Sequence, residues 1–433
     1  MNNRSIIKKF YNLSKNELYP INRSITGKGV RKTLLLIKKE FPNLKIKKIK
    51  SGKRVFDWRV PNEWNVSEAY IKDTNGKTLI NFKNNNLHLM SYSIPVKKII
   101  PRDKLLKHLY SIKKYPNAIP YITSYYKKDW GFCLSYKEKK DLKRKYKKTD
   151  KFFVNIKSNF KNNGELNYGE IILKGKSKQE ILISTYVCHP SMANNELSGP
   201  TVSMCLIKYF LNKKIDKTLR FIFIPETIGS IAYLHQNLNQ LKENVIGGYN
   251  LTCIGDNLSH SCMLSKYGNS LSDKSLMSAY KKLKINYKIY SFLKRGSDER
   301  QYNSPGIDLP ISSIFRSKYH EFKEYHTSMD DFKLVTEDGI KGGFIVARTA
   351  IEILSKKIIP KNNILCEPQL SKRNLYPKIS NFFKKNKIVN YLDFLQYSDG
   401  KNDIDEISKK IQVKKNKALQ ILQVLKKNKI INI

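Results

Sequence analysis

The chain has 433 residues, enough for several domains of about 150 residues each, and its 82 basic and 36 acidic residues give a net charge of +46. This charge brings nucleic acid, anionic membranes and acidic glycans into consideration as partners, but it reports on association rather than on fold and does not choose among them. The six cysteines form no CxxC pair, and no apolar run reaches the length of a signal peptide or a membrane span. These features argue against a disulfide scaffold, a zinc knuckle and a membrane protein, and they predict a soluble, cytoplasmic chain.

The first third of the chain divides into two kinds of segment. Residues 1–45 show helical periodicity that is interrupted around Pro20 and Gly27. Residues 46–149 consist of short, aromatic-rich, alternating stretches separated by Pro, Asn and Gly. We therefore predict helices followed by a small β-rich domain.

The middle of the chain alternates between buried strands and helices. Apolar runs at 181–187, 219–224, 249–254 and 309–315 predict strands, and helices are expected at 199–212, 229–242, 271–284 and 343–354. This alternation predicts an α/β fold with a doubly wound, mostly parallel sheet. The last sixty residues predict three short amphipathic helices and a brief strand, which together resemble a winged-helix domain at 374–433.

Four side chains that could carry chemistry follow these predicted strands, namely His189, Glu226, Asp256 and His326. Functional groups gather at the carboxyl ends of parallel strands in open α/β sheets, so we expect these four to meet. Zinc in hydrolases takes imidazole and carboxylate ligands and leaves one position to water. His189 and Asp256 would be ligands, Glu196 or Asn195 could complete the set, and Glu226 would be the general base.

The order of these motifs makes the resemblance specific. His189, the segment Asn195-Glu196-Leu-Ser-Gly, Pro-Glu226-Thr-Ile-Gly-Ser, Gly-Asp256, Ser-Asp298 and Tyr-His326-Thr-Ser resemble the zinc aminopeptidases of the bacterial leucine-aminopeptidase type. The closest resemblance is to a subfamily with a small inserted domain and a C-terminal winged helix. It implies a zinc-exopeptidase-like domain built from residues 1–45 and 150–365, interrupted by the small domain at 46–149.

Two departures from that family bear on the metal. The resemblance implies a bridging Asp where this chain has Asn195, and a second Glu where it has Thr227. A neutral amide cannot offset the charge of two dications. We therefore expect a single zinc ion, held by His189 and Asp256 with His326 from the other site, and with Glu196 in place of the absent Asp.

The polar loop at 294–302 precedes the strand that leads to His326. By analogy with the family, it would line the specificity pocket. Asp298 would orient a ligand histidine or meet a substrate amine, and Arg300 would hold a carboxylate or phosphate.

The sequence supports a metal-dependent hydrolase acting on a peptide or an amide-containing small molecule, and two alternatives remain open. One is a nucleic-acid-binding or scaffold protein with a degenerate peptidase domain. The predicted recognition helix at 414–425 has lysines at its start but no Arg to read guanine, so we favour a protein partner for the winged helix over nucleic acid. The other alternative is a deacylase or amidohydrolase in surface-polysaccharide or metabolite biosynthesis.

Overall fold

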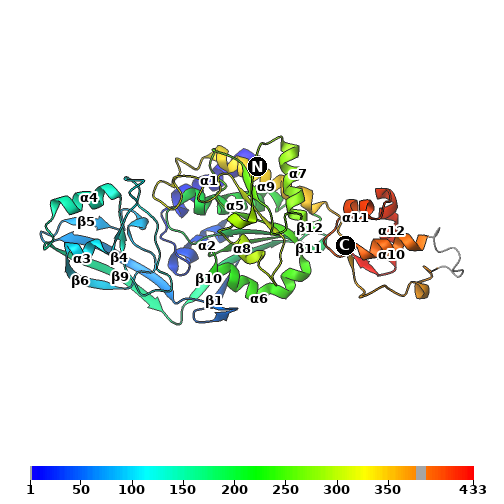
Figure 1. The fold of residues 1–433 in the computed structure, drawn as a ribbon, viewed down its shortest axis with the longest axis horizontal. Coiled ribbons are helices and arrows are strands. Elements are labelled where there is room, and N and C mark those ends of the chain that lie inside the picture. The colour runs from blue at the N-terminus through cyan, green and yellow to red at the C-terminus, as the bar shows by residue number, and fades with distance from the viewer. Residues whose placement is uncertain (1, 377–386) are drawn as a thin grey trace.

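An eight-stranded sheet forms the centre of the chain, in the order β1-β10-β12-β11-β13-β16-β14-β15 (Figure 1). The computed structural model describes residues 2–376 and 387–433. The strands are β1 Lys45–Lys50, β10 Glu165–Leu173, β11 Ser177–Tyr186, β12 Lys217–Ile224, β13 Val245–Leu251, β14 Ser261–Met263, β15 Lys288–Tyr290 and β16 Ile311–Phe315.

The sheet is mixed. Its four inner strands β12, β11, β13 and β16 are parallel, as the apolar runs predict. On one side β10 and β1 add antiparallel strands, and on the other β14 pairs antiparallel with β16. The predicted α/β class is therefore confirmed, whereas parallel pairing is limited to the four inner strands and to the edge pair β14 and β15.

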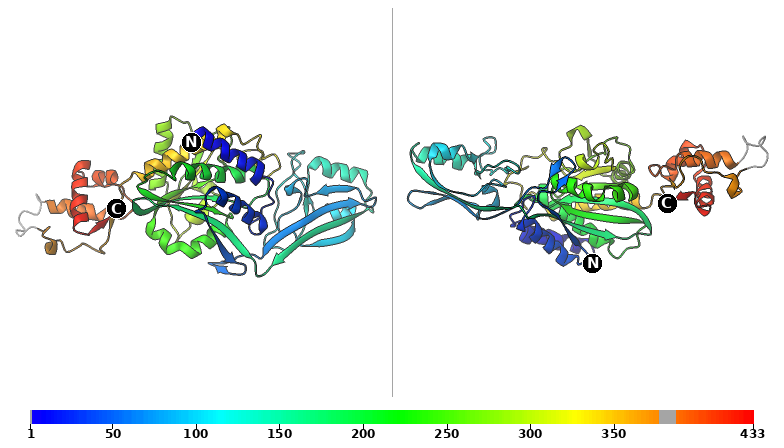
Figure 2. Two further views of the ribbon diagram at one scale, coloured as in Figure 1. Left: turned by 180° about the vertical axis from the view of Figure 1, so that it is seen from behind. Right: turned by 90° about the horizontal axis from the view of Figure 1, so that it is seen from below.

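Helices cover both faces of this sheet, as Figure 2 shows from behind and from below. Alternate residues of β11 point to opposite faces: Ile181 and Ile183 belong to one core cluster, and Leu182 belongs to the other. The first cluster packs against α1 Asn3–Leu13, α2 Lys28–Glu40, α5 Ser198–Phe210, α7 Leu271–Leu283 and α9 Glu337–Ser355. The second packs against α6 Ile228–Asn244 and α8 Glu299–Tyr302.

A four-stranded antiparallel sheet in the order β5-β4-β9-β6 lies at one end of the molecule (Figure 1). It consists of β4 Glu63–Asp73, β5 Thr78–Asn81, β6 Val96–Pro101 and β9 Lys151–Lys161, with α3 Arg102–Leu106 and α4 Tyr136–Lys145 nearby. Two short pairs, β2 Arg54–Val55 with β3 Trp58–Arg59 and β7 Leu109–Tyr110 with β8 Phe132–Cys133, complete this region. The chain passes between the two sheets twice, from β1 to β4 through the β2-β3 hairpin and from β9 directly into β10.

The C-terminal segment has its own apolar cluster. It contains α10 Lys387–Gln396, α11 Ile404–Lys410, α12 Lys415–Lys427 and the antiparallel pair β17 Lys361–Asn362 and β18 Ile431–Asn432. Residues 377–386, which fall within the predicted winged-helix range 374–433, lie outside the described residues. Within the described ranges, no helix is long and apolar enough to cross a membrane.

Candidate active site

The carboxyl ends of two neighbouring strands define the candidate site. β11 and β12 are parallel and adjacent, and His189 follows the first while Glu226 follows the second. Nε2 of His189 lies 3.7 Å from Oε2 of Glu226. The structure therefore brings together the ligand and the base that the sequence predicts, and 21% of the Glu226 side chain remains exposed to solvent.

The other ring nitrogen of His189 faces a second carboxylate. Its Nδ1 lies 2.7 Å from Oε2 of Glu196, in the short helix η3 Ala193–Leu197. The thiol of Cys188 lies 3.4 Å from the same Nδ1 and accepts the backbone N–H of Glu226. Among the described residues, potential metal ligands of Cys188, His189 and Glu196 all lie within 4.8 Å of one another. Sequence analysis missed Cys188, although its place beside His189 at a strand end was a usable signal.

A glycine allows η3 and α5 to lie this close to the sheet. A Cβ on Gly199 would be 2.3 Å from the carbonyl oxygen of Leu251, which a real side chain could not tolerate. The backbone at the start of α5 thus packs directly on the end of β13. This close approach places Glu196 over the end of β11.

A fully buried cation lies behind the cluster. The Arg23 guanidinium donates from Nε to the carbonyl oxygen of His189 at 2.9 Å, and Nε lies 3.7 Å from Oε1 of Glu196. Both charged side chains are 0% exposed. Arg23 lies between Pro20 and Gly27, where the helical periodicity of the sequence is interrupted, and the structure places this residue beside the site.

His326 lies next to His189, with ring centroids 5.3 Å apart. The ring of Tyr121 contacts His189 at 5.1 Å and His326 at 5.3 Å, edge-on in both cases. The Tyr121 hydroxyl lies 2.8 Å from that of Tyr125. A segment far away in the sequence, within the predicted inserted domain, therefore completes the surroundings of the two histidines.

Backbone strain concentrates around these residues. Thr227, Cys253 and His326 have φ values of 63°, 47° and 55°, in the left-handed region that non-glycine residues rarely adopt. Such conformations persist where the surrounding structure enforces them, and they gather at functional sites. Thr227 directly follows Glu226, Cys253 lies two residues after the end of β13, and His326 is the second histidine of the site.

Burial shifts the ionisation of the site toward neutral species. It raises the pKa of Glu226 to about 8, with the Asp298 carboxylate as the second cause, and it raises the pKa of Glu196 to about 8 against the opposing effect of Arg23. Burial, assisted by Arg23, lowers the pKa of His189 to about 3, and burial also lowers that of His326. Both imidazoles are therefore neutral at physiological pH, which is the form that binds metal ions.

Asn195 lies at the site but its oxygen is engaged. Its Oδ1 accepts a hydrogen bond from the Tyr186 hydroxyl at 3.1 Å, and its backbone N–H donates to Asp330 at 2.8 Å. Asp330 also accepts the backbone N–H of Asn194. Asp330 therefore holds η3 in place through two backbone N–H groups.

Asp256 does not join the metal-binding cluster. β13 ends at Leu251, so Asp256 lies five residues beyond the strand. Both of its oxygens are occupied: Oδ1 accepts from the Leu258 N–H and the Ser317 hydroxyl, and Oδ2 accepts from the Ser317 N–H and the Asn194 amide. These hydrogen bonds hold three loops together, and a ligand role for Asp256 stays a prediction.

The predicted substrate-binding pair divides into a buried and an exposed residue. Asp298 is buried and accepts the Thr227 N–H and the Ser230 hydroxyl, each at 2.8 Å. Its hydrogen bonds fix the turn that carries Glu226, and none of them reaches a histidine. Arg300 is exposed and donates to the Thr227 hydroxyl at 2.6 Å, so its guanidinium lies near Glu226 and can meet a ligand.

The donor set fits one metal ion. Oε1 of Glu196 is buried and has no hydrogen-bond partner among the described residues, so a cation would satisfy it. The neutral histidines and this carboxylate are ligands that zinc accepts. A second dication lacks anionic ligands, because the corresponding positions are the neutral Asn195 and Thr227, and Asp256 is engaged elsewhere.

Fold and site together define a mixed α/β protein with a candidate metal site and a C-terminal winged helix. Residues 11–357 match the family model "Domain of unknown function (DUF4910)", and residues 358–433 match a winged helix-turn-helix model. The chain belongs to the DUF4910 family.

A curated relative and several solved structures agree with this assignment. A Clostridium acetobutylicum protein described as "Putative polysaccharide biosynthesis protein with aminopeptidase-like domain" is 40% identical over 408 residues, covering 93% of this chain and 91% of the relative. A crystal structure described as a "putative peptidase" from the same organism aligns over 100% of this chain and 97% of the other, with 38% identity and a TM-score of 0.78. BSAP, a zinc aminopeptidase from Bacillus subtilis, shares the fold, with 13% identity, coverage of 80% and 94% of the two chains, and a TM-score of 0.60.

Proposed function

We propose that this chain is a metal-dependent hydrolase that cleaves an amide or peptide bond with Glu226 as its general base. The observation that carries the proposal is the 3.7 Å contact between Glu226 and His189 at the ends of two adjacent parallel strands. With its pKa raised to about 8, the ionised Glu226 carboxylate is a stronger base than an ordinary one, and the fraction in this form increases as pH rises toward 8. Proton transfer by a side chain of this kind contributes about 10²- to 10⁴-fold to a rate.

His189 and Glu196 would hold one zinc ion, with His326 or Cys188 as the third ligand. A zinc ion bound by three protein ligands acts as a Lewis acid and lowers the pKa of a water molecule in its open position. Glu226 would accept the proton of the attacking water and return it to the leaving nitrogen. Asp298 would keep Glu226 in place through the Thr227 turn, and exposed Arg300 would bind a carboxylate or phosphate of the substrate.

The second candidate substrate is an amide on a saccharide precursor. The name of the 40% identical relative refers to polysaccharide biosynthesis and supports this choice. The same base and ligands would serve, since the bond to be cleaved is again an amide.

The winged helix would then contact a protein partner. The first three residues of α12 include Lys415, which already pairs with Asp405 at 2.7 Å, so this lysine is partly neutralised for contact with phosphate.

The test combines metal analysis with one charge-removing variant. Zinc is titrated into chelator-treated protein, and hydrolysis is measured on aminoacyl 4-nitroanilides and N-acetylated amino sugars. We expect about one tightly bound zinc per chain. Glu226→Gln should keep that zinc and lose hydrolysis by at least about 100-fold. Glu243→Gln, an exposed change on the same helix α6, is the matched control. Activity retained in Glu226→Gln would refute the assignment of the base.

A further inference from the structure

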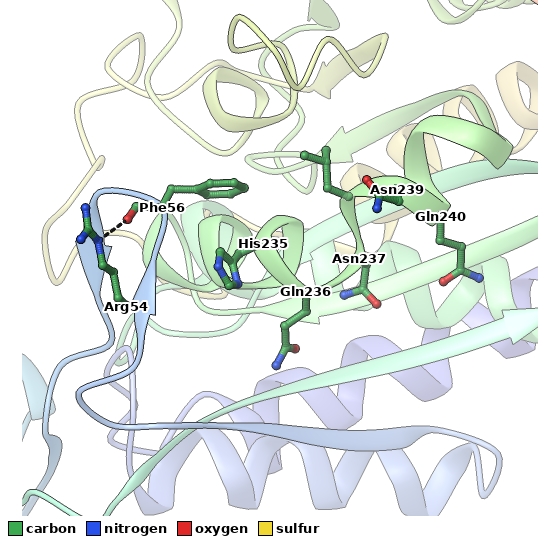
Figure 3. Close-up of a pocket in the computed structure, with 8 residues that line it drawn as sticks. Arg54, Phe56, His235, Gln236, Asn237, Asn239 and Gln240 are labelled. Atoms are coloured by element: carbon green, nitrogen blue, oxygen red, sulfur yellow. Dashed lines mark hydrogen bonds between the residues drawn. The ribbon is translucent and has the colours of Figure 1, made fainter.

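A second concave surface lies on α6, away from the cluster at its start. A cleft of about 770 Å³, within the usual range for ligand sites, is lined by Arg54, Phe56, His235, Gln236, Asn237, Leu238, Asn239 and Gln240 (Figure 3). None of these residues belongs to the site around His189 and Glu226. The hairpin β2-β3 supplies one wall, and the second half of α6 supplies the other (Figure 3).

The hairpin exposes two aromatic rings to solvent, and one of them belongs to a residue with a strained backbone. Val55 pairs with Trp58, so Phe56 and Asp57 form a two-residue turn, and Phe56 has a φ of 54°. Such turns favour Asn or Gly, because a bulky side chain with positive φ is strained. Phe56 is 43% exposed to solvent, and Trp58, two positions further along the chain, is 41% exposed. Strain of this kind, combined with exposed aromatic rings, points to a functional reason for the sequence.

The Phe56 ring is fixed over α6. It contacts the ring of His235 edge-on, with centroids 5.2 Å apart. The backbone carbonyl of Phe56 accepts a hydrogen bond from Nε of Arg54 at 3.1 Å, which is the dashed line in Figure 3. The contact with His235 therefore holds the Phe56 ring against α6.

The wall on α6 is made of amides rather than charges. Gln236, Asn237, Asn239 and Gln240 follow almost consecutively, and each amide offers both donors and an acceptor. Gln236 uses its oxygen for the Tyr168 hydroxyl at 3.2 Å, and Asn237 uses its NH₂ for a backbone carbonyl at 2.8 Å. The Gln236 NH₂ group and the Asn237 side-chain oxygen make no hydrogen bond with another described residue, so the wall offers both a donor and an acceptor.

The cleft carries little charge, because Arg54 is the one charged residue among the eight that line it. A phosphate-rich ligand would require cations, since phosphate neutralisation dominates such binding. Paired amides beside an aromatic face instead match a ligand with many neutral hydroxyl and amide groups.

We propose that this cleft binds a neutral N-acetylated oligosaccharide, with a sugar ring or acetyl methyl group against Phe56 and sugar hydroxyls against the α6 amides. Residues 235–240 lie 7 to 12 positions beyond the first residue of α6, or about 10–18 Å along the axis at 1.5 Å per residue. A ligand here would be the distal part of a substrate whose amide reaches Glu226. That link rests on the proposed function, whereas binding in the cleft requires neither metal nor Glu226.

Calorimetric titration of the full chain with chitotetraose, the tetramer of N-acetylglucosamine, tests the proposal. Phe56→Ala and the double variant Gln236→Ala/Gln240→Ala should each weaken binding at least tenfold, and Phe56→Trp should restore it. The control Gln420→Ala/Gln423→Ala removes two exposed amides from α12 and should leave binding unchanged. Thermal unfolding of each variant verifies that these surface changes leave the fold intact.

The alternatives give distinct results. Cellotetraose, which lacks acetyl groups, should bind more weakly than chitotetraose. Failure of chitotetraose to bind, or binding that ignores both cleft variants, would overturn the proposal. Binding of tetra-alanine with the same sensitivity to Phe56→Ala would make the cleft a peptide site and would also overturn it. Glu226→Gln should bind chitotetraose like the wild type. Binding in the cleft can therefore be tested even if the hydrolase proposal fails.

Discussion

The backbone N–H of Tyr121 donates to the carbonyl oxygen of His326 at 2.9 Å, and this bond ties the predicted inserted domain into the candidate site. The backbone N–H of Ser328 donates in turn to the carbonyl of Ile119 at 2.8 Å. Two chain segments some 200 positions apart are thus held side by side. As a result, the Tyr121 ring lies against both histidines rather than over open solvent.

The first prediction follows from this packing. Tyr121→Ala removes the ring that orients His189 and His326, and we expect zinc affinity to fall about tenfold, the lower end of what lost support for ligand histidines costs. Tyr121→Phe keeps the ring and should keep the affinity. Competition with a chromogenic chelator measures both. Tyr267→Ala, at a residue that is 77% exposed, is the control. Equal affinities for wild type and Tyr121→Ala would show that the ring does not support the ligands.

The second prediction concerns the ion pair behind the cluster. Arg23→Met takes the cation away from the Glu196 carboxylate; because burial raises the Glu196 pKa to about 8, that charge forms mainly above pH 8, where we expect the variant to lose at least about 1 kcal/mol more unfolding free energy than at pH 7. Adding Glu196→Gln removes that charge, so the double variant should recover much of the loss. Urea unfolding of the three proteins gives the coupling. Glu40→Gln, which breaks the more exposed Lys9–Glu40 pair, should cost less than about 1 kcal/mol. If the double variant is no more stable than Arg23→Met, the pair is not coupled.

The sequence was a good guide where chemistry lies directly at a strand end. His189 and Glu226 come within three residues of β11 and β12, and their meeting follows from parallel pairing alone. Asp256 lies farther from the strand end than the sequence indicates, because the apolar run 249–254 extends three residues past the end of β13. The residues that occupy the strand end are Thr252 and Cys253, and hydrophobicity cannot show where hydrogen bonding between strands stops.

Other parts of the site depend on contacts that no local pattern encodes. Arg23, Tyr121 and Asp330 reach the site from segments that lie more than 60 residues from Cys188 and His189 in the sequence. The antiparallel strands β10 and β14 are likewise invisible to periodicity, because a buried strand has the same pattern in either direction. Helix positions were easier: the helices expected at 229–242 and 271–284 are present as α6 and α7.

The third prediction uses the Arg31–Glu63 pair, which joins α2 to the small sheet. Burial alone would raise the pKa of Glu63, but hydrogen bonds from Arg31 and Asn65 lower it to about 2, below its ordinary value of 4.5. A lowered carboxyl pKa gives stability that is fully present above pH 4.5 and is lost as pH falls toward 2. Glu63→Gln should therefore destabilise the protein by about 2 kcal/mol at pH 7 and by progressively less between pH 4.5 and 2. Denaturant unfolding across this range measures the difference, and a pH-independent difference would contradict the ion-pair explanation.

The last prediction separates the two carboxylates that the sequence treated alike. Glu196→Gln removes a charged ligand beside His189, so zinc affinity should fall by at least about tenfold. Asp256→Asn should leave zinc binding unchanged, because its oxygens are engaged with Asn194, Leu258 and Ser317. The new amide NH₂ cannot accept the two hydrogen bonds that one carboxylate oxygen accepted, so Asp256→Asn should instead cost about 2–4 kcal/mol of stability. Zinc titration and urea unfolding of both variants therefore give opposite patterns. If Asp256→Asn loses zinc at a temperature where the variant is folded, Asp256 belongs to the ligand set. Unfolding could not then explain the lost zinc, and a contact between Asp256 and the metal would be required.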